Sequence, residues 1–109
     1  KKYFVNKKNV DLRYMTVSLD SLKNKNMDAG LHPRDKTGRV QIVNKVLNAK
    51  YYRLIKQFKL LTGISAVLNT SFNIHGKPIV YSPEDAIIAF KKSGLEYLVI
   101  DNYLIKKIW

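Results

Sequence analysis

Small polar side chains gather after a short apolar run in the second half of the chain. The run Ile64–Asn69 leads into the segment 70–78, which reads TSFNIHGKP. Hydroxyl and carboxamide groups can donate hydrogen bonds to phosphate or carbonyl oxygens, and a glycine lets the backbone approach a ligand closely. Open α/β sheets bind ligands at the carboxyl ends of their strands, so this pattern predicts a binding site here. The expected site residues are Thr70, Ser71 and Asn73, with His75 and Lys77 as weaker candidates. A polar turn, in which Ser71 and Asn73 only cap backbone groups, is the alternative.

A second candidate lies earlier, in the segment 32–41, which reads HPRDKTGRVQ. Arg39 opens a predicted strand over Arg39–Val43, where a rigid backbone would aim the side chain. Its guanidinium is suited to grip a phosphate or carboxylate with two hydrogen bonds. An ion pair between Arg39 and Asp35 is the alternative. His32 and Gln41 are weaker candidates along the same edge.

The sequence lacks the residues that several kinds of chemistry require. The chain has no cysteine and two histidines, so we expect no disulfide, thiolate chemistry or metal site. The glycine-rich phosphate loops are absent, and no Ser–His–Asp set is evident. No apolar run approaches the roughly 20 residues of a membrane span, so we expect no membrane partner. Nothing in the sequence requires an oxidising compartment, and we expect a cytoplasmic location.

The chain is strongly basic, with 20 Lys and Arg against 8 Asp and Glu and a net charge of +12. This balance favours polyanionic partners such as nucleic acid or nucleotide phosphates. Sixteen of these cations are lysines, however, and dispersed lysine mostly confers solubility, so specific nucleic-acid binding is not expected. A basic RNA-binding module without catalysis remains the alternative function, with tyrosines available for stacking on bases: Tyr51, Tyr52, Tyr81, Tyr97 and Tyr103.

The order of the predicted strands and helices indicates one small α/β (α+β) domain, with a small mixed sheet and two main helices. These elements must position the candidate site residues. We expect residues 1–11 to form a basic N-terminal extension, frayed or paired as an edge strand, and residues 12–109 to form the domain. Further strands are predicted over Leu12–Leu19, Ile64–Asn69, 97–101 and 103–109. The last of these has an edge on which a homodimer could form.

Two helices have clear signals. Apolar residues recur at three- and four-residue spacing through 48–63, and Gly63 fits the position just after the last turn. The predicted buried face of this first helix is Tyr51, Leu54, Ile55, Phe58 and Leu61. The second helix begins with Ser82 as N-cap, Pro83 at the first position and an acidic first turn, and Gly94 ends it.

Four runs together resemble the C-terminal end of the O-carbamoyltransferases, the nodulation- and antibiotic-modifying family. They are TGRVQ at 37–41, LNTSFN at 68–73, GKPIV at 76–80 and SPEDA at 82–86. The resemblance covers about residues 12–106, and the LNTSFN run is its most specific part. It implies a C-terminal domain resembling threonylcarbamoyl-AMP synthase (YrdC-like), of which this chain would be a part.

The resemblance also implies an activity. Such a domain uses ATP, with Mg²⁺ bound to it, and carbamoyl phosphate to form carbamoyl-adenylate, and an N-terminal domain then transfers the carbamoyl group to a hydroxyl. The resemblance places Ser71 and Asn73 on the adenylate and Arg39 on phosphate as the catalytic cation. Lys77 departs from the family, which commonly has an acidic residue there. The transfer domain and part of the basic nucleotide site are not among these residues, so we expect a distal piece of a longer enzyme, inactive in isolation.

Overall fold

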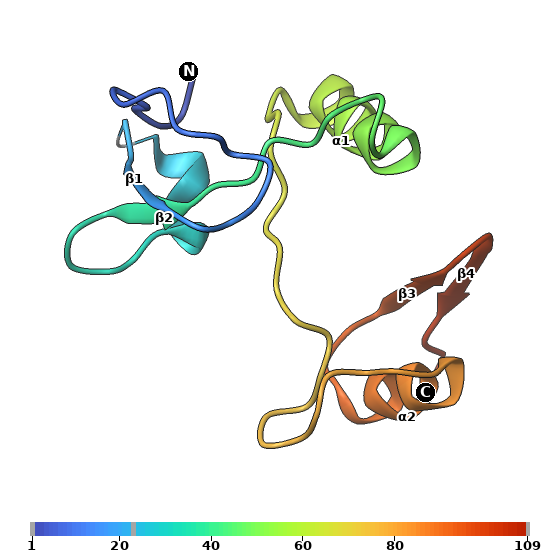
Figure 1. Cartoon of the computed structure of the whole chain (residues 1–109). Coiled ribbons are helices and arrows are strands. Elements are labelled where there is room, and N and C mark those ends of the chain that lie inside the picture. The colour runs from blue at the N-terminus through green and yellow to red at the C-terminus, as the bar shows by residue number, and fades with distance from the viewer. Residues whose placement is uncertain (1, 23, 109) are drawn as a thin grey trace. The chain divides into compact units, whose positions relative to one another are not determined.

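The computed structural model describes residues 2–22 and 24–108, and the chain divides into two compact units, Lys1–Leu68 and Asn69–Trp109 (Figure 1). The first unit holds β1 (Ser18–Asp20), the 3-10 helix η1 (Lys25–Gly30), β2 (Thr37–Arg39) and α1 (Ala49–Thr62). The second holds α2 (Pro83–Lys92), β3 (Tyr97–Ile100) and β4 (Tyr103–Lys106). The predicted α+β class is confirmed. Within it, the described strands form two separate antiparallel pairs, not one mixed sheet.

The sheet of the first unit is short and shifted from the predicted positions. β1 pairs with β2 so that Ser18 lies opposite Arg39 and Asp20 opposite Thr37. Arg39 therefore ends a strand, and the prediction that it opens one over Arg39–Val43 is wrong. Beyond β2 the chain still runs beside the 12–13 segment, because Ile42 N–H donates to the Leu12 carbonyl (2.7 Å). This single contact is no ladder, so the alternating composition of RVQIV does not make a strand.

The N-terminal segment belongs to the body of the first unit. Phe4 forms an isolated antiparallel bridge with Ser21, and Tyr3 is buried. The Tyr3 hydroxyl accepts hydrogen bonds from the Ser65 N–H (3.0 Å) and from its hydroxyl (3.3 Å). Phe4 also explains a glycine: a Cβ added to Gly38 in β2 would lie 2.9 Å from its ring, so any other residue here would force the ring to shift. Residues 3–5 are thus paired, and of the two expectations for this segment the frayed end does not hold.

The first predicted helix is confirmed as α1, whose ends lie where the sequence placed them. The Asn48 side chain accepts from the Tyr51 N–H, and Gly63 is the C-cap. The prediction that α1 has a buried apolar face is wrong. None of its 14 residues, all of them described, is buried, and Leu54, Phe58 and Leu61 are exposed.

The predicted buried strand Ile64–Asn69 is wrong, because the structure shows no strand there. Residues 64–67 are half-buried and Leu68 is exposed. An apolar run forms a central strand only when neighbouring strands supply backbone partners on its edges. The described strands of this chain are all paired elsewhere.

The core of the second unit packs α2 against the terminal hairpin. Ser82 and Asp85 form a complete capping box at the start of α2. Phe90, which is 1% exposed, joins Ala86 and Leu98 as the centre of this core. β3 and β4 are joined through Asp101 and Asn102, and Asp101 adopts a φ of 49°. The hairpin is therefore confirmed, although β4 ends at Lys106 and Trp109, the end of the predicted strand, lies outside the described residues.

A lysine ties the hairpin to the end of α2. The Lys107 ammonium donates to the carbonyls of Ser93 (2.7 Å) and Lys91 (3.2 Å), which no helical N–H satisfies, and lies 5.2 Å from the centre of the Phe90 ring. A cation at this place also complements the negative end of the helix dipole. No helix among the described residues is long and apolar enough to cross a membrane.

Candidate functional site

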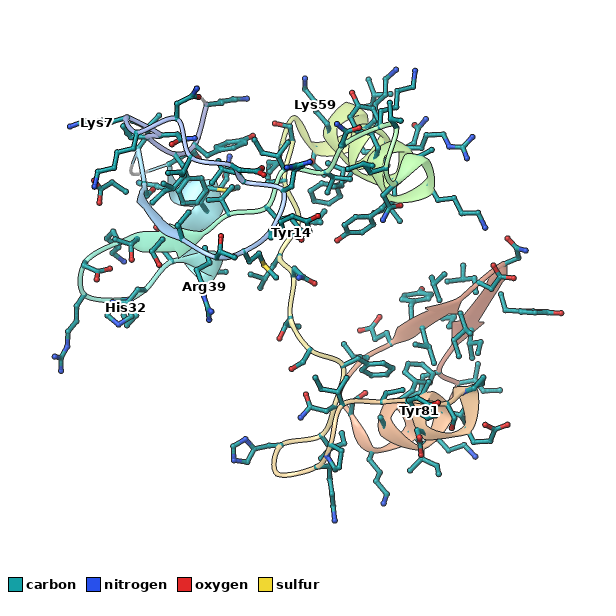
Figure 2. All side chains as sticks on the ribbon, in the orientation of Figure 1. Lys7, Tyr14, His32, Arg39, Lys59 and Tyr81 are labelled. Atoms are coloured by element: carbon teal, nitrogen blue, oxygen red, sulfur yellow. The ribbon has the colours of Figure 1, made fainter. Side chains whose placement is uncertain are left out.

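Arg39 lies at an open pocket of about 390 Å³ in the first unit. Strand pairing fixes its backbone at the end of β2, and Figure 2 shows Arg39 and His32 extending from the same part of this unit. The lining residues are Ser18, Gly30, His32, Asp35, Thr37, Gly38 and Arg39. A pocket of this volume is large enough for a phosphate-bearing group.

The Arg39 guanidinium has no hydrogen-bond or ion-pair partner among the described residues. The alternative of an Arg39–Asp35 pair therefore does not hold. Instead, Asp35 Oδ1 accepts from the Thr37 N–H (2.9 Å) and hydroxyl (2.8 Å), and His32 Nδ1 lies 3.2 Å away. These contacts, those of Thr37 above all, lower the pKa of Asp35 below its ordinary 3.8. The carboxylate opposes an anion in the pocket, but its charge is directed towards the turn and His32, which leaves Arg39 available.

Gln41, a weaker candidate, has a structural contact. Its side-chain amide donates to the Arg13 carbonyl at 2.9 Å and holds the 12–13 segment beside the chain after β2. His32 lines the pocket with Arg39. The pair of cationic side chains at this pocket is thus Arg39 and, when protonated, His32.

The second cluster lies in the second unit, on the polar segment 70–78. The Ser71 hydroxyl donates to Asn73 Oδ1 at 2.8 Å, so the structure brings these two predicted residues together. Asn73 Nδ2 in turn donates to the carbonyls of Lys77 (2.9 Å) and Ile74 (3.3 Å). Asn73 thereby clamps the loop that follows it, as the turn interpretation expects. Its two amide hydrogens are occupied in this state, while the oxygen of Ser71 keeps its capacity to accept.

The clamped loop turns at Gly76. Lys77 N–H donates to the Ile74 carbonyl at 2.9 Å, and Gly76, the third residue of this turn, has a φ of 75°. A positive φ at the third position is the mark of a type II turn and favours glycine. The open space around Gly76 shows that backbone conformation, not crowding, selects it.

Three side chains of this segment stay available. Thr70, His75 and Lys77 are exposed, and none of their side chains forms a hydrogen bond or ion pair with another described residue. The predicted site residues therefore form two groups. Arg39, His32 and Gln41 belong to the first unit, and Thr70, Ser71, Asn73, His75 and Lys77 to the second. Each group is a structure within its own unit, and their union in one site remains a proposal.

The pocket also contains residues that sequence reasoning missed. Ser18 enters through its pairing with Arg39 across β1 and β2, and Gly30 through the end of η1. Both contacts join residues distant in the sequence, so no local motif signals them. Thr37 also lines the pocket, and its signal is local, because an Asp two residues before a Thr is a frequent turn arrangement. Residues 2–22 and 24–108 contain no group of three or more His, Asp or Glu side chains that could hold a metal ion.

Comparison with known proteins places this chain in a family. The model of the carbamoyltransferase C-terminus matches residues 1–107, so the chain belongs to that family. Two of the relatives that match this chain are uncharacterized proteins. The uncharacterized protein MJ1058 of Methanocaldococcus jannaschii is 48% identical over 73 residues, and the uncharacterized protein sll1178 of Synechocystis is 42% identical over 73 residues; each match covers 67% of this chain and 12% of the relative.

A third relative has a named role. The nodulation protein NolNO of Sinorhizobium fredii is 44% identical over 73 residues, which are 67% of this chain and 11% of that protein. This chain thus spans only about 12% of the length of the relatives that it matches.

Proposed function

We propose that this chain is the distal part of an O-carbamoyltransferase and contributes to the site where ATP and carbamoyl phosphate form carbamoyl-adenylate. The observation that carries the proposal is the Arg39 guanidinium, which is exposed at a pocket and unpaired among the described residues, in a member of the carbamoyltransferase C-terminus family. An unpaired guanidinium held by a strand is suited to bind a phosphate.

In this proposal, water cleaves carbamoyl phosphate to carbamate and inorganic phosphate, and a carbamate oxygen then attacks the α-phosphate of ATP and displaces pyrophosphate. Arg39 stabilises the negative charge that this adenylation places on the α-phosphate and the departing pyrophosphate. Such preorganised stabilisation is commonly the largest contribution to catalysis. Thr70 and Ser71 contact the adenylate with their hydroxyls. Asn73 orients Ser71 through the 2.8 Å hydrogen bond and reaches the adenylate only if it exchanges one of its amide bonds within the loop.

The substrates bring their own cofactor. ATP would carry Mg²⁺ on its phosphates with mostly water ligands, a mode that needs few protein carboxylates. Transfer of the carbamoyl group to an acceptor hydroxyl would occur in an N-terminal domain of the same longer polypeptide. We therefore propose that the 109 residues alone form no carbamoyl-adenylate, and that the longer polypeptide acts in the cytoplasm.

One observation supports a second candidate function, a polyanion-binding module. Tyr81 is 97% exposed and Tyr103 is 73% exposed, on a chain with a net charge of +12. Exposed aromatic rings among cations can stack on unpaired bases. The tyrosines of α1 are less available, since Tyr51 is half-buried and Tyr52 is only 38% exposed.

The test is a binding titration of the longer polypeptide with a non-hydrolysable adenylate analogue. We expect Arg39→Ala to weaken binding about 10- to 150-fold, since a hydrogen bond to a charged group contributes about 1.5–3 kcal/mol. Arg34→Ala is the matched control, because Arg34 is also an exposed arginine of the 32–41 segment but does not line the pocket. Equal affinities of the two variants would contradict the role of Arg39.

A further inference from the structure

A histidine and an aspartate meet in the turn before β2, at the pocket that contains Arg39. His32 Nδ1 lies 3.2 Å from Asp35 Oδ1, and both residues line the pocket. A carboxylate beside Nδ1 holds the proton of a neutral imidazole on that nitrogen, which leaves Nε2 as a hydrogen-bond acceptor. Nε2 has no hydrogen-bond partner among the described residues. The pair thus has the form of a base whose tautomer is set by a carboxylate.

The backbone of the turn holds this pair in place. The His32 N–H donates to the Thr37 carbonyl (2.8 Å), and the Lys36 N–H donates to the His32 carbonyl (3.0 Å). Asp35 Oδ1 is held in turn by the Thr37 N–H and hydroxyl. Both members of the pair are therefore fixed at their own positions, and a general base needs such fixing because geometry decides whether it reaches its proton.

The remaining pocket residues define what can bind beside the pair. Arg39 is the other charged residue that lines the pocket, while β1 and η1 contribute the uncharged Ser18 and Gly30. The unpaired Arg39 guanidinium is suited to a phosphate group. A small acyl phosphate bound there would have its acyl group in the same pocket of about 390 Å³ as the imidazole.

We propose that His32 is the general base for the cleavage of carbamoyl phosphate by water, with Asp35 as its positioning residue. Nε2 takes a proton from water as the water oxygen forms a bond to the carbonyl carbon. The bond from that carbon to the phosphate oxygen breaks, and its electron pair leaves with the phosphate, which Arg39 binds. The imidazolium then gives its proton to the phosphate, and the carbamic acid ionises to carbamate. The inference rests on the proposed function, because it assigns a residue to the first step of that reaction.

The test measures inorganic phosphate released from carbamoyl phosphate by the longer polypeptide, above the rate without protein. His32→Asn is the test variant, because the asparagine amide can still donate to Asp35 while the base at Nε2 is lost. Arg34→Asn is the matched control, since Arg34 is an exposed residue of the same turn and does not line the pocket. We expect His32→Asn to release phosphate at least about 100-fold more slowly, the usual contribution of a general base, and Arg34→Asn to keep the unsubstituted rate.

Two further measurements separate a base from a structural role. Ammonium carbamate supplies the product of the cleavage, so it should drive pyrophosphate release from ATP equally well in His32→Asn and in the unsubstituted polypeptide. Phosphate release by the unsubstituted polypeptide should also fall as the pH drops from 8 to 5, the range in which histidines gain a proton. The residual rate of His32→Asn should lack this fall.

Three results would overturn the proposal. The first is a rate of phosphate release in His32→Asn equal to that of Arg34→Asn. The second is an unchanged pH profile in His32→Asn. The third is carbamate that drives pyrophosphate release in the unsubstituted polypeptide but not in His32→Asn, which would show a damaged site. Failure of the nucleotide site is distinguishable: adenylate analogue bound equally by Arg39→Ala and Arg34→Ala would contradict that site, while slow phosphate release in His32→Asn would still assign the base.

Discussion

The availability of Arg39 follows from what its neighbours bind. Asp35, the carboxylate nearest in sequence, accepts two hydrogen bonds from Thr37 and faces His32. The guanidinium is left at the pocket without an intramolecular partner among the described residues. Sequence alone could place Arg39 beside a turn, but it could not decide between pairing with Asp35 and binding a ligand, because that choice depends on the hydrogen bonds of the turn.

The turn at Asp35 makes a pH prediction. Because its folded pKa is lowered below 3.8, mainly by the Thr37 N–H and hydroxyl, the carboxylate contributes its full stabilisation above that value. This contribution is lost as the pH falls through the folded pKa. We expect the Thr37 amide signal in NMR spectra to titrate with a midpoint below 3.8, and Asp35→Asn to abolish that titration. A midpoint at or above 3.8 would show that the turn hydrogen bonds are absent in solution.

At the scale of elements, the sequence predicts correctly those features that depend on interactions between residues close together in the chain. Both helices begin at caps that the sequence displays, and α1 ends at the predicted Gly63. α2 ends at Lys92 with Ser93 as its C-cap, one residue before the predicted Gly94. The Asp101–Asn102 turn joins the two strands of the hairpin. The segments Arg39–Val43 and Ile64–Asn69 have strand composition but form no strands over those ranges, because strands depend on distant partners. Ser18 and Gly30 were absent from the predicted site because they too reach the pocket through partners distant in the sequence.

The turn at Gly76 should be as important for the second cluster as the Asn73 clamp. Gly76→Ala forces a side chain into a φ of 75°, so we expect the second unit to lose about 1 kcal/mol of unfolding free energy. Gly94→Ala is the control, since Gly94 also has open space around it and no positive φ. Urea unfolding followed by fluorescence measures both. Equal effects of the two substitutions would mean that the turn differs in solution.

At the scale of the whole molecule, the charge of +12 should act without sequence preference. If dispersed lysines supply the affinity for RNA, the association constant should fall roughly 1,000-fold between about 50 and 200 mM salt, through counterion release. Ser71→Ala and Asn73→Ala remove no charge and should leave this binding unchanged. Fluorescence anisotropy with two unrelated RNA sequences gives the measurement. Salt-resistant binding that Asn73→Ala abolishes would support the binding module over the carbamoyltransferase.

The central claim is that Arg39 of this chain supports adenylation of a carbamoyl group in a longer enzyme. The most direct measurement is pyrophosphate release from ATP by the longer polypeptide, with and without carbamoyl phosphate. We predict release that depends on carbamoyl phosphate, falls about 100-fold in Arg39→Ala and stays near the unsubstituted rate in Arg34→Ala. Release that needs no carbamoyl phosphate, or an Arg39→Ala rate equal to that of Arg34→Ala, would contradict the account.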